Sequence, residues 1–367
     1  MNRKSGKKHD FFKLFDKYTS ATRRGKRVQK SGKRVKKDSL ENYFYLRKLL
    51  AKFCEVEQFS LQIHSFTKIS KRDFKSQQIY WKRFYQRFSD FLYEKENCYD
   101  NYVGASIKML RTFFNYLNDE LGLNVGSFHK NFYAPHEEIQ IVTLTPERLN
   151  FLIYNKEFEN SLSDKLKRVK DLFVFGCTVA LRVSDLLILK PSNIERTKFF
   201  DPVSQQVKDR AYLKVVSKKT ETFTRVWLPD YIISILNKYS GRKNRILPYY
   251  HKNILGKFIK ELAEKAEWTE PCEKSRHRRG VPIVIYRDPA KKMHYRFCDL
   301  VSTHTMRRTA VTTMLCLGMK EEAVRKISGH APGSKEFYRY VSFAQSYLDT
   351  EVELMHQKRD EKQLAFA

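Results

Sequence analysis

Apolar residues recur at intervals of three or four along the first third of the chain, as they do on one face of an α-helix. Three such stripes precede residue 131, and each predicts an amphipathic helix. The first follows Ser39, a residue type that commonly caps helices, and the others occupy residues 75–93 and 103–121. The pattern therefore predicts a helical domain over residues 38–135. The periodicity is then lost over residues 136–144, which we expect to form a linker.

Helical and alternating patterns mix beyond the linker. Thr145-Pro146 supplies an N-cap and a proline in the first helical turn, where proline is tolerated. Further helices are expected over residues 162–181, 230–238 and 253–267, and strands around Phe199 and over residues 211–217, 224–228, 281–286 and 293–297. Residues 218–222 read as a hairpin tip, and residues 273–280 as a basic loop. The fold class we expect is mainly α with a small antiparallel β-sheet, with a mixed α+β domain over residues 145–345.

The stretch from residue 301 to residue 340 combines helix signals with reactive side chains. Two helices are predicted, one from Thr303 and one over residues 321–327, because Gly318 and Gly329 are typical helix ends. A turn at Pro332-Gly333 then leads into a third, short helix. The reactive side chains of this stretch are His304, Arg307, Arg308, His330, Tyr338 and Tyr340. Guanidiniums, imidazoles and a phenol brought together suit chemistry on a phosphate diester.

The charge of the chain points to a polyanionic partner. The formal net charge is +30, and nucleic acid is the commonest polyanion that such a field attracts. An anionic membrane surface is the alternative, but no stretch approaches the roughly 20 apolar residues of a spanning helix. We therefore expect a cytoplasmic, nucleoid-associated protein with no membrane partner.

The first 37 residues are the most basic part of the chain. They hold fifteen Lys or Arg against two Asp, and residues 23–37 have almost nothing to bury. Residues 1–37 are expected to form a basic tail with one short amphipathic helix near its start. The tail either contacts DNA phosphates or is simply solvated.

Basic and aromatic residues also interleave in the predicted helical domain. This mixture suits a helical clamp on a DNA backbone, and it equally suits a helix bundle with a hydrated basic face. The candidate DNA-binding residues are Lys82, Arg83, Arg87, Lys108 and Arg111, with Arg308 from the second domain.

The sequence carries little sign of a metal or nucleotide cofactor. Its six cysteines are scattered singly, without metal-binding spacing, and are expected to be free thiols in a reducing compartment. A phosphate-binding loop ending in Gly-Lys-Ser/Thr is missing from the sequence, so nucleotide hydrolysis is not expected. We expect no cofactor.

The cationic residues of the second domain fit one chemical hypothesis. Arg182 closes a strongly apolar helix and needs an anion, which either a local pair with Asp185 or a phosphate can supply. Arginine forks match the non-bridging oxygens of a phosphodiester, and a hairpin-tip lysine, Lys218 or Lys219, can protonate a departing sugar oxygen. A tyrosine nucleophile retains the phosphodiester energy in a covalent phosphotyrosine, so the reaction needs no ATP.

The order of these residues resembles that of the tyrosine recombinase (phage integrase) family, most like the integrases of bacterial mobile elements. The resemblance covers about residues 40–345. Its segments are Ala180-Leu181-Arg182-Val183-Ser184-Asp185, Lys218-Lys219-Thr220, His304-Thr305-Met306-Arg307-Arg308, Gly329-His330 and Phe337-Tyr338-Arg339-Tyr340. Three departures are Ala180 where glycine is common, Arg308 where many members have histidine, and one extra residue between His330 and Tyr340.

The resemblance implies a helical core-binding domain and a catalytic domain that cuts and rejoins specific DNA sites. The reaction passes through a 3′-phosphotyrosyl intermediate without metal or ATP, and it integrates or excises a mobile element. The implied roles are phosphate binding for Arg182, His304, Arg307 and His330, general acid for Lys219 or Lys218, and nucleophile for Tyr340 in preference to Tyr338. The implied partners are double-stranded DNA sites, a homotetramer on synapsed DNA, and accessory DNA-bending or directionality factors.

The C-terminal segment and the exact function leave alternatives open. Residues 346–367 are expected to form a helix with Leu348, Val352 and Met355 at helical spacing. In the recombinases that this chain resembles, such a helix docks onto the neighbouring subunit; the alternative is that it folds back on its own domain. Two other functions compete, a type IB topoisomerase-like DNA-relaxing enzyme and a non-catalytic, sequence-specific DNA-binding protein on the same scaffold.

Overall fold

The computed structural model describes residues 6–28, 32, 34–35, 39–202, 205–217, 222–242 and 244–364. The chain divides into two compact units. Unit 1 is Met1–Ile139 together with Ser275–Ile285, and unit 2 is Gln140–Lys274 together with Tyr286–Ala367. The first boundary lies between residues 139 and 140, within the segment that the sequence predicts to be a linker.

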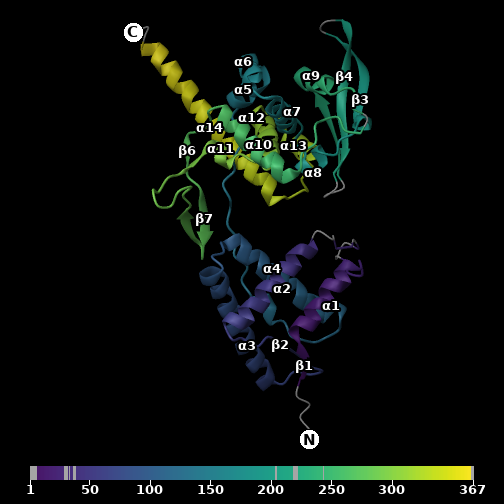
Figure 1. Cartoon of the computed structure of the whole chain (residues 1–367), viewed down its shortest axis with the longest axis vertical. Coiled ribbons are helices and arrows are strands. Elements are labelled where there is room, and N and C mark those ends of the chain that lie inside the picture. Colours follow the sequence, from purple (N-terminus) through teal and green to yellow (C-terminus); the bar gives the residue numbers. More distant parts are fainter. Residues whose placement is uncertain are drawn as a thin grey trace. The chain divides into compact units, whose positions relative to one another are not determined.

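Helices packed around an aromatic core make up most of unit 1 (Figure 1). They are α1 (Phe11–Arg23), α2 (Ser39–Val56), α3 (Lys71–Asp90) and α4 (Asp100–Asn115), with short helices η1 (Phe91–Lys95), η2 (Tyr116–Glu120) and η3 (Phe128–Asn131). Strands β1 (Lys7–Asp10) and β2 (Gln62–Ser65) pair antiparallel. The Ser70 hydroxyl caps α3 by accepting the backbone N–H of Asp73. The three predicted stripes correspond to α2, α3 and α4, and the last two continue through π-helical turns.

The N-terminal segment belongs to the core of unit 1. The rings of Phe11, Phe15 and Tyr18 on α1 are fully buried, and all three pack against Phe113 of α4. Arg27 is also buried, with its guanidinium 4.1 Å from the centroid of the Tyr18 ring. The prediction of a basic tail is therefore wrong for residues 7–28, because the aromatic residues of α1 bury enough apolar surface to fold the segment into the unit. Residues 29–31, 33 and 36–38 lie outside the described residues.

A β-hairpin late in the sequence also belongs to unit 1. Strands β7 (Ser275–Arg278) and β8 (Val281–Val284) pair antiparallel, and their tip residues Arg279 and Gly280 have φ angles of +56° and +78°. The buried carboxylate of Asp100 accepts the backbone N–H groups of both tip residues at 2.8 and 2.9 Å. Glu137 similarly accepts hydrogen bonds from Arg276. The segment predicted as a basic loop over residues 273–280 is therefore largely a strand, held by two acidic residues that precede it in the chain by more than a hundred positions.

Unit 2 combines α-helices with small antiparallel sheets, as the sequence predicts. Its helices are α5 (Pro146–Tyr154), α6 (Lys156–Ser161), α7 (Asp164–Val179), α8 (Val183–Leu186), η4 (Pro191–Asn193), α9 (Asp230–Lys238), α10 (Lys252–Lys265), α11 (Phe297–Leu300), α12 (Thr303–Cys316), α13 (Glu321–Ser328) and α14 (Lys335–Leu364). Strands β3 (Ile194–Asp201), β4 (Gln206–Val216) and β5 (Phe223–Leu228) form one sheet in that order, and β6 (Pro271–Cys272) pairs with β9 (Tyr295–Arg296). A Cβ atom at Gly176 on α7 would lie 2.5 Å from the Met306 sulfur on α12, so glycine permits the close packing of these two helices.

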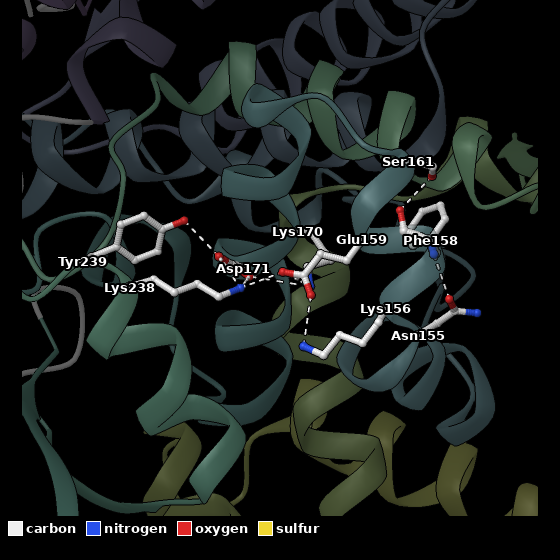
Figure 2. Close-up of polar contacts among 9 residues, drawn as sticks. All are labelled: Asn155, Lys156, Phe158, Glu159, Ser161, Lys170, Asp171, Lys238 and Tyr239. Atoms are coloured by element: carbon white, nitrogen blue, oxygen red, sulfur yellow. Dashed lines mark hydrogen bonds and ion pairs between the residues drawn. The ribbon is translucent and has the colours of Figure 1, made fainter.

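A network of charged side chains ties α6, α7 and α9 together (Figure 2). Glu159 of α6 forms ion pairs with Lys170 Nζ of α7 at 3.2 Å and with Lys238 Nζ of α9 at 2.7 Å. The neighbouring carboxylate of Asp171 accepts the hydroxyl of Tyr239 at 2.9 Å and pairs with Lys238 at 3.3 Å. The network fixes the position of α7, whose far end leads into the Arg182 segment.

The C-terminal helix is longer than the sequence predicts. The short helix expected around Tyr340 and the segment expected after residue 345 form one continuous helix, α14, which extends beyond the other helices of unit 2 in Figure 1. Val352 on it is exposed, whereas the side chains of Leu348 and Met355 lie outside the described residues. Within the described residues, the membrane-span criteria of length and apolarity are met by none of the helices.

Candidate active site

The turn after α7 positions the first arginine. Ala180 ends the helix in the left-handed conformation, with φ of +56°, which costs a residue other than glycine about 1 kcal/mol. This turn directs the Ala180 carbonyl oxygen to Arg307 Nη1, which donates to it at 2.9 Å. Arg182 follows at the start of α8. The alanine that departs from the family pattern thus still makes the turn, and the turn links the arginine segments on α8 and α12.

Ser217 connects Arg182 with Asp185. Arg182 Nη1 donates to the Ser217 hydroxyl oxygen at 2.9 Å, and this hydroxyl donates to Asp185 Oδ2 at 3.1 Å. Asp185 is buried, and Ser217 directly follows strand β4, one residue before Lys218 in the sequence. The sequence offered a local pair of Arg182 with Asp185 as one alternative. In the structure the Ser217 hydroxyl bridges these two residues. Sequence reasoning missed Ser217, although its position directly before Lys218 was a signal.

Arg307 and His330 form a buried pair. Arg307 is 7% exposed, and its Nη2 atom lies 3.0 Å from His330 Nε2. Burial and the nearby charge of Arg182 lower the pKa of Arg307 to about 10. Tyr340 and Asp185 raise it, but they compensate only in part. Burial and the charges of Arg307 and Arg182 lower the pKa of His330 to about 3, so its ring is neutral at pH 7.

Both ring nitrogens of His330 are engaged. Arginine can only donate, so the neutral ring accepts from Arg307 Nη2, which lies 3.0 Å from Nε2 and 3.4 Å from Nδ1. Nδ1 also lies 2.7 Å from the Ser328 hydroxyl, which donates to the Val324 carbonyl at 2.7 Å. The lone pair of the imidazole is therefore directed at Arg307.

The two candidate tyrosines lie in different environments. Tyr340 is 4% exposed and packs with Phe337 and Val311, whereas Tyr338 is 54% exposed. The Tyr340 ring centroid lies 5.8 Å from that of His330. Burial and the carboxylate of Glu336 raise the pKa of Tyr340, and the charges of Arg308 and Arg307 oppose this effect. The structure thus brings Tyr340, rather than Tyr338, next to the arginines and the histidine.

The remaining candidates of the second domain are placed less completely. His304 is exposed in the first turn of α12, one turn before Arg307. Arg308 is half-buried, near Tyr340. Lys218 and Lys219 lie outside the described residues, between the ends of β4 and β5. In the described part of the chain, no group of His, Cys, Asp and Glu side chains is arranged to hold a metal ion.

The candidate DNA-binding residues of unit 1 are of two kinds. Lys82, Arg83 and Lys108 are exposed on α3 and α4, and Arg111 is half-buried. Arg87 donates to Glu57 at 2.8 Å and thereby ties α3 to the loop after α2. The structure therefore gives Arg87 an intramolecular role that the sequence did not predict.

Comparison with known structures identifies the fold. The chain is similar to a lambda integrase dimer bound to a COC′ core site, with 11% sequence identity and a TM-score of 0.56 over 91% of this chain and 77% of that chain. It is also similar to the Tn1549 transposon integrase in complex with transposon right end DNA, with 14% identity and a TM-score of 0.51 over 90% and 93% of the two chains. Neither a protein-family model nor a curated protein matches the sequence. The chain has the tyrosine recombinase fold.

Proposed function

We propose that this protein is a tyrosine-type site-specific DNA recombinase that integrates or excises a mobile element. The observation that carries the proposal is the cluster of Arg182, Arg307, His330 and Tyr340 on the tyrosine recombinase fold. A phosphodiester fits this cluster, because two arginines provide the paired donors that its non-bridging oxygens require. The structures named above contain DNA, which supports double-stranded DNA as the partner.

In the proposed reaction the Tyr340 oxygen attacks a phosphorus atom of the DNA backbone. Arg182 and Arg307 stabilise the charge on the non-bridging oxygens, while Lys219, or Lys218, protonates the departing 5′-oxygen. His304 and neutral His330 complete the phosphate site, with His330 orienting the Arg307 guanidinium. The product is a 3′-phosphotyrosyl bond, which a second 5′-hydroxyl reopens without ATP.

The proposal extends to the assembly on DNA. Exposed Lys82, Arg83 and Lys108 on unit 1, with Arg111 and Arg308, are proposed to contact the DNA backbone. Two synapsed sites would be held by a homotetramer, with accessory DNA-bending or directionality factors selecting integration or excision. The projecting end of α14 is proposed to dock onto a neighbouring subunit.

Trapping the covalent intermediate tests the proposal. A DNA site with a nick beside the cleavage point releases a short fragment and leaves wild-type protein attached. Tyr340→Phe is expected to abolish this adduct and retain site binding, whereas the matched variant Tyr338→Phe is expected to retain both. Adduct formation by Tyr340→Phe, or mapping of the adduct to Tyr338, would contradict the assignment. Recombination between two sites, measured against relaxation of supercoiled plasmid, separates a recombinase from a topoisomerase.

A further inference from the structure

The carboxylate of Glu336 lies one helical turn before the tyrosine. Glu336 and Tyr340 are four residues apart on α14, so their side chains share a face. The Tyr340 hydroxyl donates to Glu336 Oε1 at 3.4 Å, and Arg339 Nη1 donates to Glu336 Oε2 at 3.1 Å. The Glu336 side chain is 48% exposed and Tyr340 is buried, so the carboxylate lies where the buried phenol reaches solvent.

His330, a base whose ring lies next to the phenol, is already engaged. The ring accepts from Arg307 Nη2, which lies 3.0 Å from Nε2, and its Nδ1 atom lies 2.7 Å from the Ser328 hydroxyl. To take a proton from Tyr340, the ring would have to give up the hydrogen bond that orients Arg307 toward the phosphate. A carboxylate has spare acceptor capacity, because each of its oxygens carries two lone pairs.

We propose that Glu336 is the general base of the strand-cleavage step, an inference that rests on the function proposed above. As the Tyr340 oxygen forms its bond to phosphorus and the bond from phosphorus to the 5′-oxygen breaks, the phenol proton moves to Glu336 Oε1. The departing 5′-oxygen takes its proton from the general acid. During rejoining a 5′-hydroxyl attacks the phosphotyrosine, and Glu336 returns its proton to the leaving phenol oxygen.

The transfer is reasonable although a free carboxylate is a weaker base than a phenolate. The phenol oxygen donates electron density to phosphorus during attack, so its proton becomes acidic only in the transition state. The hydrogen bond at 3.4 Å is long for an O–H donor, as is common before a substrate tightens a catalytic site. Arg307 and Arg308 lie near the same phenol and favour its ionised form.

The test measures single-turnover cleavage of a nicked DNA site by wild type, Glu336→Gln and Glu336→Asp. General bases contribute about 10²–10⁴-fold, so Glu336→Gln is expected to cleave at least about 10²-fold more slowly with unchanged DNA affinity and thermal midpoint. Glu336→Asp, which keeps the carboxylate, is expected to recover part of the rate. Glu322→Gln is the matched control, because Glu322 forms an exposed i,i+4 pair with Lys326 on α13.

The pH profile separates a base from a structural contact. The other groups around Glu336 and Tyr340 are Arg339 on α14, Arg307 and Arg308 on α12, and His330 in the loop after α13. All of them are present in each variant, so the acid limb that wild type shows and Glu336→Gln lacks belongs to Glu336. A wild-type or faster rate for Glu336→Gln, or an unchanged acid limb, overturns the inference. If wild type itself forms no adduct, the proposed function fails instead.

Discussion

Replacing Glu159 with Gln tests the charge network that holds α7. The substitution keeps the size of the side chain but removes the negative charge that pairs with Lys170 at 3.2 Å and Lys238 at 2.7 Å. Lys170 is only 5% exposed in its side chain, so it cannot replace the missing partner with water. The Asp171 carboxylate remains 3.7 Å from Lys170 Nζ and compensates in part for the lost negative charge.

The burial of the ion pair and the pKa of Glu159 set the size of the effect. Removing one partner of a buried ion pair costs about 3–5 kcal/mol, and the remaining Asp171 reduces this to about 2–3 kcal/mol. The pKa of Glu159 supports this range: burial alone would raise it, but Lys238 and Lys170 outweigh burial and lower it from 4.5 to about 2. At about 1.4 kcal/mol per pKa unit, such a change corresponds to about 3 kcal/mol before screening by solvent is discounted.

The sign of the pH dependence follows from the lowered pKa. The carboxylate contributes its full stabilisation above pH 4.5, the pKa of a free glutamate, and loses it as the pH falls toward about 2. The stability difference between wild type and Glu159→Gln should therefore be largest near pH 7 and should shrink below about pH 4.5.

Calorimetric unfolding of the full chain measures the midpoint of the unit 2 transition and so tests this prediction. For a unit of this size, 2–3 kcal/mol corresponds to a fall of about 4–12 °C in the midpoint of the unit 2 transition. Glu261→Gln is the control, because its pair with Lys165 is about 40% exposed on both sides and should contribute less than about 1 kcal/mol. Equal midpoints for wild type and Glu159→Gln at pH 7, or a difference that does not shrink in acid, would contradict the stabilising role of the Glu159 carboxylate.

Two further predictions concern DNA cleavage and binding. Lys219→Ala should slow cleavage by about 10²–10⁴-fold with little effect on binding, and a 5′-bridging phosphorothiolate should restore its rate; rescue of Lys218→Ala instead would move the general acid by one residue. DNA affinity should fall steeply with salt, and replacing exposed Arg23, Arg24 and Lys26 with Gln should flatten the slope of log K against log salt by about 0.9 for each DNA phosphate that the variant no longer neutralises. Arg27 is retained because it is buried in unit 1. Deletion of residues 1–37 would also remove the buried aromatic residues of α1 and unfold the unit, so it does not test the arm. An unchanged slope in the Gln variant would show that the three replaced charges are merely solvated.

Local patterns predicted most of the helices but not their long-range partners. The stripes that predict α2, α3 and α4 are visible in sequence because each helix buries one face. Nothing local distinguishes an aromatic segment in a basic tail from one that packs against Phe113, about a hundred residues away. The same limit applies to β7 and the hairpin tip after it, whose backbone N–H groups donate to Glu137 and Asp100 although the neighbouring basic residues resemble a loop. Boundaries also moved where a helix had no stop signal, as in α14, which continues through residue 345.

In the candidate site too, the sequence identified the main residues but not the contacts that orient them. Motif spacing selected Arg182, Arg307, His330 and Tyr340, and the structure brings these four together. Their protonation and orientation depend on Ser217, Ser328 and Glu336, which belong to no recognisable spacing. Because Arg307 occupies the His330 lone pair, this histidine is better suited to hold the arginine than to take a proton from Tyr340. The proposal of Glu336 as the base therefore depends on the hydrogen bonds of His330 with Arg307 and Ser328, which the sequence alone does not reveal.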